Sequence, residues 1–362
     1  MKNKIDYKLF IAVLLIATFG IVMIFSASSI WAEYKFHDPF KFIKAQGLFF
    51  IVGIFIMLFL SKVDYHLYFK KANTILFVCF LLLVLVLIPG IGTIRNGSRS
   101  WFGLGGFGIQ PSEFAKIGLI IYVAKYLYNN KKNMRDIKKG VLPILSVIMV
   151  FFGLIMLEPD FGTAMVIVLT LVVMIFISGV KVSFFVKIGL VGLIGIVGLI
   201  IVAPYRMARI VSFLNPWTDP LGSGFQIIQS LYAIGPGGLL GQGFMQSRQK
   251  HFYLPEPQTD FIFSIISEEF GFLGVLIVTS IFFFIFYRAL NISLKQSDLF
   301  GKYLAFGLSF GIIIQALLNL MVVVGIIPVT GVTLPFLSYG GSSLLVSMAS
   351  IGIILNVSRN QK

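Results

Sequence analysis

The sequence is poor in charged residues and in cysteine. Only 12% of its 362 residues are charged and 58% are hydrophobic, whereas a soluble domain carries about 25% charged residues. The chain therefore cannot build the water-facing surface of a soluble protein. Its single cysteine, Cys79, lies inside the apolar run 75–87, which excludes disulfide frameworks and cysteine metal clusters. We expect Cys79 to be a small buried hydrophobic residue.

Several catalytic signatures are missing as well. The three histidines, His37, His66 and His251, are too scattered for a metal site or a catalytic triad. There is no Gly-x-Ser-x-Gly elbow, and the glycine-rich run 235–243 has neither the Gly-Lys-Ser/Thr nor the preceding strand of a nucleotide P-loop. These glycines either let backbone N–H groups approach an anion or form a re-entrant turn. The spacing alone does not decide between the two.

What the sequence does contain is a series of apolar runs long enough to cross a bilayer, which takes about 20 residues per helix. We predict an all-α polytopic membrane protein with ten transmembrane helices, forming a single domain over residues 1–362. The first run is too long for a cleavable signal peptide, so we expect the N-terminus to be retained. The predicted spans cover residues 8–28, 45–61, 72–89, 111–128, 141–158, 161–179, 183–203, 268–290, 302–326 and 333–356.

The distribution of Lys and Arg predicts the orientation of these spans. With both termini cytoplasmic, the inner segments hold 19 of the 29 basic residues, and 10 of the 14 acids lie at or beyond the outer face. The formal charge of +15 is then a topology signal facing membrane lipids, and we expect no nucleic-acid partner. Residues 204–267 form a large extracytoplasmic loop between helices seven and eight, and a loop of this length is usually functional.

Two charged residues lie inside the predicted fourth span. Proline at 111 followed by Glu113 is an ordinary way to start a helix. Lys116, however, lies three residues after Glu113 and so shares its face of the helix. Burying a charged group at this depth is energetically unfavourable, so such groups usually face a partner or a water-filled cavity. The pair is either a substrate-binding site or a structural ion pair.

Two more acids, Glu158 and Asp160, lie in the tight turn between the fifth and sixth spans. Asp160 is placed to cap the helix that follows. Two carboxylates two residues apart also suit a divalent cation such as Mg²⁺ or Mn²⁺. The sequence offers no further ligand for such a metal.

The large outer loop carries most of the remaining outer cations. Arg206 and Arg209 lie just outside the seventh span, where guanidinium groups can meet phosphates at the headgroup level. A helical stretch is predicted over 224–233. At its C-terminal end the loop holds three residues that we expect to contact the substrate, Ser247, Arg248 and Lys250.

Asp260 begins a polar stripe at the entrance to the eighth span. Small or polar residues recur four, seven, eight and eleven positions after it, which is one face of a helix, and Thr259 is placed as the N-cap. A polar stripe on a helix entering the membrane points into the protein. A carboxylate partly desolvated there has a raised proton affinity unless a cation compensates, which suits a general base. We expect Asp260 to be that base and Thr259 to contact the substrate.

Four segments together resemble the shape, elongation, division and sporulation (SEDS) family of bacterial polytopic membrane proteins, whose members include FtsW, RodA and SpoVE. The resemblance covers nearly the whole chain, and the run 203–250 is more similar to the division and sporulation branch than to the elongation branch. The segments are Gln-Pro-Ser-Glu at 110–113, Glu-Pro-Asp-Phe-Gly-Thr at 158–163, Tyr-Leu-Pro-Glu to Thr-Asp-Phe-Ile-Phe at 253–263, and Leu-Pro-Phe-Leu-Ser-Tyr-Gly-Gly-Ser-Ser at 334–343.

The resemblance implies a ten-helix fold and a peptidoglycan glycosyltransferase of the bacterial cytoplasmic membrane. Such an enzyme polymerises lipid II on the outer leaflet into undecaprenyl-linked glycan, and it pairs with a class B penicillin-binding protein, a transpeptidase that cross-links the product. The family's essential Thr-Asp-Phe aspartate matches Asp260. The acid and lysine of its Gln-Pro-Ser-Glu helix match Glu113 and Lys116.

These residues suggest a mechanism as a hypothesis. Polymerisation joins the 4-hydroxyl of an incoming N-acetylglucosamine to the anomeric carbon of the growing chain, whose leaving group is a lipid pyrophosphate. Asp260 would take the hydroxyl proton, with a divalent cation near Glu113 or Asp160 as a further aid. An inverting single displacement needs no enzyme nucleophile. The cations expected to stabilise the leaving group are Lys116, Arg206, Arg209 and Lys250.

Two other functions remain open at this point. Ten helices with internal charges also suit a transporter that flips lipid II across the membrane. The gathering of polar residues at one face rather than at the midplane favours the enzyme. A non-catalytic scaffold for a transpeptidase is the third possibility, and it requires neither Asp260 nor Lys116 for cell-wall synthesis.

Overall fold

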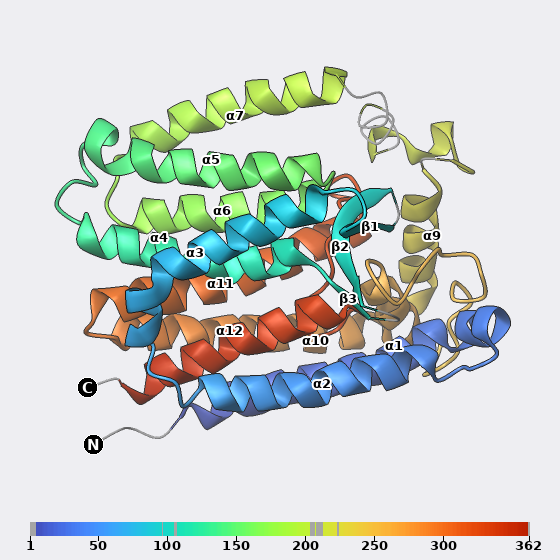
Figure 1. Ribbon diagram of the computed structural model, residues 1–362. Coiled ribbons are helices and arrows are strands. Elements are labelled where there is room, and N and C mark those ends of the chain that lie inside the picture. Colours follow the sequence, from blue (N-terminus) through green and yellow to red (C-terminus); the bar gives the residue numbers. More distant parts are fainter. Residues whose placement is uncertain are drawn as a thin grey trace.

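The computed structural model describes residues 5–95, 97–104, 107–202, 207, 213–222 and 224–360. In this part of the chain ten long helices coincide with the ten predicted spans and run together as one bundle (Figure 1). Their bounds are α1 (Tyr7–Phe36), α2 (Lys41–Leu60), α3 (His66–Leu87), α4 (Pro111–Asn129), α5 (Leu142–Leu157), α6 (Phe161–Ile177), α7 (Val182–Val202), α10 (Ile262–Lys295), α11 (Leu299–Val323) and α12 (Gly341–Arg359).

Length and composition support a membrane-spanning bundle. Seven described helices are long and apolar enough to cross a membrane: α1, α2, α3, α10, α11, α12, and α5 together with the π-helical turn Ile137–Val141 that precedes it. Helix α6 is apolar but has only 17 residues, and α4 carries Glu113, Lys116 and Lys125. The chain is a multi-pass membrane protein.

Both ends of the chain lie at the same end of the bundle, here called the terminal end (Figure 1). The opposite end, the loop end, carries a small sheet, the short helix α9 (Phe225–Ile234) and the loop that follows it. The helix predicted over 224–233 is thus confirmed as α9. Which end faces the cytoplasm stays a prediction from the basic residues.

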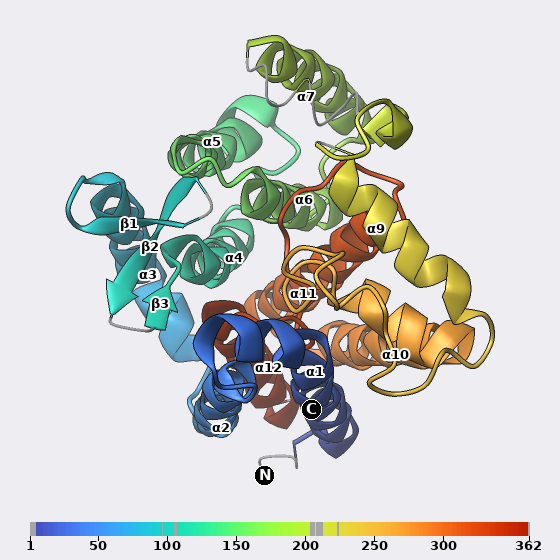
Figure 2. The ribbon, with the colours of Figure 1, turned by 90° about the vertical axis from the view of Figure 1, so that its right-hand side faces the viewer.

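Helix α11 lies in the middle of the bundle. Viewed from the loop end, α4, α6, α10 and α12 surround it (Figure 2), and each of these four helices packs against it. Side chains on several faces of α11 are therefore buried, including Gln315 and Asn319. Its polar residues must find their partners inside the protein.

Aspartates begin three of the helices. Asp6 accepts a hydrogen bond from the Leu9 N–H at 2.9 Å, and Asp298 accepts one from the Gly301 N–H at 2.9 Å. Asp160 accepts one from the Thr163 N–H at 3.1 Å, so its predicted role as a helix cap is confirmed. Each carboxylate satisfies a backbone donor that the first turn of a helix leaves open.

Several predicted boundaries need correction, among them the start of the third span, which lies at His66 instead of residue 72. The first span was expected to end at residue 28, but α1 continues to Phe36. Within it, Ser28 Oγ donates to the Ile24 carbonyl at 2.6 Å, so this serine does not interrupt the helix. The tenth span begins at Gly341 instead of 333. The preceding residues fold into a turn in which Ser338 Oγ accepts from the Leu334 N–H at 2.8 Å. The eighth span begins earlier than predicted, at Ile262.

A three-stranded antiparallel sheet lies in the connection between α3 and α4. Phe102 in the central strand pairs with Gly92 on one side and with Ile109 on the other. Gly97 has a φ of +80° in the first turn, and Asn-Gly at 96–97 is a strong signal for a hairpin. The strands are β1 (Gly92–Arg95), β2 (Ser98–Leu104) and β3 (Phe107–Ile109).

Candidate active site

The charged pair of α4 lies at the loop end of the bundle. Lys116 Nζ lies 2.7 Å from Glu113 Oε2, and the two side chains are only 11% and 6% exposed. The same ammonium donates to Gln315 Oε1 of α11 at 2.6 Å. Lys116 therefore does face partners, as expected of a charge inside a span. Its role in substrate binding stays a prediction.

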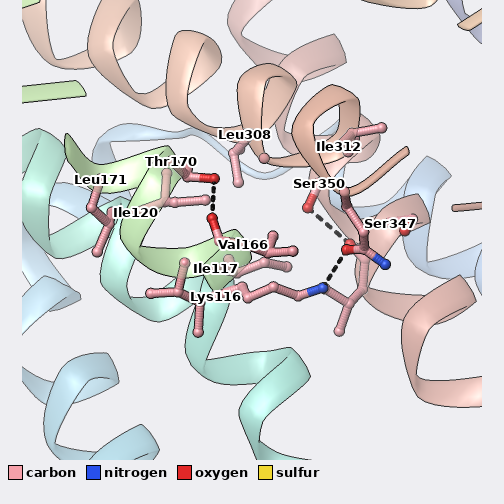
Figure 3. Close-up of a pocket in the computed structure, with 14 residues that line it drawn as sticks. Lys116, Ile117, Ile120, Val166, Thr170, Leu171, Leu308, Ile312, Ser347 and Ser350 are labelled. Atoms are coloured by element: carbon pink, nitrogen blue, oxygen red, sulfur yellow. Dashed lines mark hydrogen bonds between the residues drawn. The ribbon is translucent and has the colours of Figure 1, made fainter. Parts of the chain in front are cut away.

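A small pocket lies beside Lys116, between α4, α6, α11 and α12 (Figure 3). Its volume is about 30 Å³, enough for about one or two water molecules. Most of its lining is apolar, but Thr170, Ser347 and Ser350 contribute hydroxyl groups. Thr170 and Ser350 donate to carbonyls four residues earlier in their own helices, so their oxygen lone pairs remain available as acceptors.

Two amides of α11 connect this region to Asp260. Gln315 Nε2 donates to the Thr333 carbonyl at 3.0 Å. Asn319 Nδ2 donates to the Val332 carbonyl at 2.7 Å and to the Asp260 carbonyl at 2.7 Å. One face of α11 thus contacts Lys116, Asp260 and the segment 332–333 that joins α11 to α12.

Asp260 lies half-buried just before α10 begins. A Cβ atom placed on Gly331 would lie 3.8 Å from Asp260 Oδ2, and Gly331 has a φ of +74°. The carboxylate therefore faces the connection between α11 and α12. The polar stripe that follows it is buried, since Ser264, Ser267 and Glu268 are at most 3% exposed, which confirms that this face points into the protein.

The N-cap predicted at Thr259 is wrong. Helix α10 begins at Ile262, with Phe261 in the cap position and no side-chain cap. Thr259 Oγ1 instead donates to the Glu256 carbonyl at 2.8 Å within the preceding turn. The chain turns once more before the helix starts, which moves Asp260 out of the first helical turn.

Asp160 is surrounded by hydrogen-bond donors. Its Oδ2 accepts from Gln110 Nε2 at 2.8 Å and from Ser112 Oγ at 3.3 Å, while Oδ1 caps α6. Within the described residues, no group of three or more His, Cys, Asp or Glu side chains could hold a metal ion. The donors around Asp160 and the Lys116 ammonium beside Glu113 do not fit a divalent cation at either carboxylate.

Glu158, in the same turn, has a different environment. Its side chain is fully buried, and neither carboxyl oxygen has a hydrogen-bond partner. Burial, with a smaller contribution from the charge of Asp160, raises the pKa of Glu158 to about 9. Glu158 is therefore a protonated, neutral acid near pH 7.

Three loop residues that were predicted to contact the substrate bind to two neighbouring acids of α10, Glu268 and Glu269. Ser247 Oγ donates to Glu268 Oε2 at 2.5 Å, and the Arg248 backbone N–H donates to Glu268 Oε1 at 2.8 Å. The Arg248 side chain itself is exposed. Lys250 Nζ lies 3.0 Å from Glu269 Oε1, and these two side chains are 1% and 0% exposed. Lys250 is thus buried in an ion pair, whereas Arg248 faces solvent.

The glycine-rich run 235–243 packs against a break in α10. Gly271 has a φ of +62° inside the helix, and the carbonyls of Glu268 and Glu269 accept from the N–H groups of Gln242 and Gly243 at 2.9 and 3.0 Å. The Phe272 N–H donates to the Gly238 carbonyl at 2.8 Å. The run replaces helical hydrogen bonds that the break removes. These contacts favour the re-entrant turn over an anion site.

Two of the predicted site residues, Arg206 and Arg209, lie outside the described residues. Three other residues of this region did not stand out in the sequence: Glu269, Gln315 and Asn319. The sequence did contain a signal that these residues matter, because each is an amide or acid inside an apolar span. It could not show which residues they contact, because those partners lie far away in the chain.

The described architecture matches a known family. The profile of the FtsW/RodA/SpoVE family, described as a cell cycle protein, matches residues 7–362. This chain belongs to that family. Its curated relatives include stage V sporulation protein E of Bacillus subtilis, 53% identical over 358 residues, covering 99% of this chain and 98% of that protein. They also include the probable peptidoglycan glycosyltransferase FtsW of Trichlorobacter lovleyi, 44% identical over 357 residues, with 99% and 94% covered.

Solved structures of the family share the fold. A chain from a study of the structural coordination of polymerization and crosslinking by a peptidoglycan synthase complex matches with a TM-score of 0.78 and 32% identity, covering 98% of each chain. The rod shape determining protein RodA of Thermus thermophilus matches with a TM-score of 0.73 and 29% identity, covering 99% of this chain and 98% of that one. The helical polytopic fold expected from the sequence is confirmed, and the small sheet before α4 is the part that the all-α prediction missed.

Proposed function

We propose that this family member is a peptidoglycan glycosyltransferase that polymerises lipid II at the outer face of the bacterial cytoplasmic membrane. The observation that carries the proposal is that α11 holds both Lys116 and Asp260, through Gln315 and Asn319. A membrane-embedded cation and a carboxylate near one end of the bundle suit a substrate that combines a lipid pyrophosphate with a sugar. The names of the curated FtsW relatives support the same activity.

In the proposed reaction, the 4-hydroxyl oxygen of the incoming sugar attacks the anomeric carbon of the growing chain. The new C–O bond forms as the bond to the lipid pyrophosphate breaks, and the configuration at the anomeric carbon inverts. Asp260 accepts the hydroxyl proton as general base. No enzyme nucleophile is required.

The departing pyrophosphate needs positive charge. We propose that Lys116 supplies one cation inside the bundle and that Arg248, whose side chain is exposed, supplies another. Arg206 and Arg209 remain proposed ligands of the same group. Lys250 is paired with Glu269 and Ser247 is bonded to Glu268, so both side chains would have to give up these partners to contact the substrate as proposed. Thr259, next to Asp260 in the chain, stays a proposed substrate contact.

The proposed assembly follows from the same chemistry. A polymerised glycan must be cross-linked, so we propose a class B penicillin-binding protein, a transpeptidase, as the partner. A structural relative comes from a peptidoglycan synthase complex in which polymerization and crosslinking are coordinated, which supports this pairing. Residues 1–362 are proposed to act as one membrane domain, and the outer loop predicted over 204–267 ends where α10 begins, at Ile262.

The decisive experiment is lipid II polymerisation by the purified complex carrying Asp260→Asn. Because a general base contributes about 10²–10⁴-fold, we expect polymer formation to fall by at least about 10²-fold. The matched control is Asp38→Asn, which removes a partly exposed aspartate paired with Lys44 between α1 and α2 and should leave the rate unchanged.

Three results would count against the proposal. Full polymerisation by a correctly folded Asp260→Asn variant would refute Asp260 as the base. Transport of labelled lipid II into liposomes without any polymerisation would identify a transporter. Intact cell-wall synthesis with Asp260→Asn and Lys116→Met, while the partner stays bound, would identify a scaffold.

A further inference from the structure

Helix α11 places two buried amides one turn apart. Gln315 and Asn319 are 4% and 1% exposed, and residues four apart share one face of a helix. Their separation along the helix axis is about 6 Å. Inside a membrane bundle a buried amide is costly unless its groups are hydrogen-bonded.

The partners of these amides come from opposite sides of the site. Gln315 offers its oxygen to the Lys116 ammonium at 2.6 Å, since an ammonium can only donate. Asn319 offers its nitrogen to the Asp260 carbonyl at 2.7 Å, since a carbonyl can only accept. One amide therefore contacts the cation of the site, and the other contacts the backbone of the residue that carries the base.

Both amides also hold the same short segment. Gln315 Nε2 donates to the Thr333 carbonyl at 3.0 Å, and Asn319 Nδ2 donates to the Val332 carbonyl at 2.7 Å. Thr333 Oγ1 in turn donates to Ser343 Oγ of α12 at 3.0 Å. The segment 332–333 is thus fixed between α11 and α12, and it cannot shift without disturbing a bond to each amide.

We propose that Gln315 and Asn319 are positioning residues that set the spacing between the Lys116 ammonium and Asp260. They touch neither sugar nor pyrophosphate. They hold the cation and the base-bearing backbone against one rigid segment, so that both are in place before the substrate binds. This inference rests on the proposed function.

The test is steady-state lipid II polymerisation by the purified complex carrying Asn319→Ala. A misplacement of about 1 Å can cost about 10²-fold in rate, so we expect kcat to fall by about 10- to 100-fold while the KM for lipid II stays nearly constant. Asn319→Gln, which retains the amide donors on a longer side chain, should recover part of the lost kcat. Asn319→Ser is the milder variant to measure should Asn319→Ala not fold.

The matched control is Asn356→Ala at the terminal end of the bundle. Asn356 is 3% exposed; its oxygen accepts from the Tyr65 N–H at 2.9 Å, and its nitrogen donates to the Ser61 carbonyl at 3.0 Å. The Asn356→Ala variant therefore loses buried hydrogen bonds similar to those of Asn319→Ala, but far from Lys116 and Asp260. The thermal stability of both variants is measured in the same detergent, and the folded Asn356→Ala variant should keep its kcat.

The outcomes separate this inference from the proposed function. A normal kcat in Asn319→Ala, or the same loss of kcat in Asn356→Ala at equal loss of stability, overturns the positioning role. If Asp260→Asn is inactive while Asn319→Ala is normal, only the positioning role fails. If Asp260→Asn polymerises lipid II normally, the proposed function itself fails.

Discussion

Buried carboxylates in this protein are stabilised in two ways. Glu113 and Glu269 each meet a lysine ammonium, whereas Glu268 meets a serine hydroxyl and the backbone N–H of Arg248. Glu158 has neither kind of partner within the described residues. The first three carboxylates are held by charge and hydrogen bonding, and Glu158 is accommodated by keeping its proton.

The proton on Glu158 makes stability depend on pH. Its pKa rises from an ordinary 4.5 to about 9 on folding, so between these values the unfolded chain binds fewer protons than the folded one, and stability falls as pH rises. We expect the melting temperature to decline from pH 5 to pH 9 and Glu158→Gln to flatten that decline, with a gain near pH 7 of about 1–3 kcal/mol.

Melting curves across this pH range, in one detergent, test the expectation. Glu33→Gln is the control, because Glu33 is exposed near the end of α1. An unchanged pH dependence in Glu158→Gln would show that another group carries the proton.

Variants of Lys250 can show whether this lysine stabilises the fold or binds the substrate. Lys250→Ala leaves the buried Glu269 carboxylate without its ammonium, and breaking a buried pair in this way costs about 3–5 kcal/mol. The double variant Lys250→Met with Glu269→Gln removes both charges and should recover much of that stability. We expect its KM for lipid II to be unchanged. A raised KM in the folded double variant would instead assign Lys250 to the pyrophosphate.

The break in α10 is the least regular feature among the helices. Gly271 combines a φ of +62° with a ψ of −159°, a conformation that is essentially restricted to glycine. The glycine-rich run 235–243 fills the resulting gap with backbone contacts. The break and the run therefore depend on one another, and together they fix where the outer loop meets the bundle.

Gly271→Ala should disrupt this arrangement. A Cβ atom at residue 271 would lie 2.4 Å from the Gly241 nitrogen, and the backbone conformation alone costs an alanine about 1–3 kcal/mol. We expect a clear drop in melting temperature. Gly153→Ala on α5 is the matched control, because its Cβ would meet nothing within 4 Å, and it should be neutral or slightly stabilising. Equal melting temperatures for the two variants would contradict the packing described here.

Helix positions could be predicted from the sequence because the length of each apolar run can be read directly and compared with the roughly 20 residues that a membrane span needs. The hairpin before α4 had a local signal at Asn-Gly 96–97. The contacts of Asn319 had none, because Asp260 lies 59 residues away in the chain. Gln315 likewise meets Lys116 from a distance of 199 residues. Hydrophobic periodicity shows which residues are buried, but it does not show which distant helix lies opposite.

At the scale of the whole molecule, the basic residues predict that the terminal end of the bundle faces the cytoplasm. In a Cys79→Ala background, which removes the only cysteine, Tyr34→Cys introduces a thiol at a position that is 75% exposed in the wild type, near the loop end of α1. Asn129→Cys introduces one at the opposite end of α4. We expect a membrane-impermeant thiol reagent to label residue 34 in intact cells and residue 129 only after permeabilisation. The reverse pattern would invert the orientation.

The length of α1 also provides a scale of depth for the whole molecule. Its 30 residues extend for about 45 Å, well beyond the hydrocarbon thickness of about 30 Å. Ser26, whose hydroxyl donates to Glu269 at 2.6 Å, lies about 29 Å along the helix from Tyr7. With Tyr7 at one boundary of the hydrocarbon, the buried pair of Lys250 and Glu269 lies at the other boundary, level with the lipid headgroups. The two charges are enclosed by the protein and offset one another as an ion pair, and at that depth they lie far from the membrane centre, where a buried charge costs most.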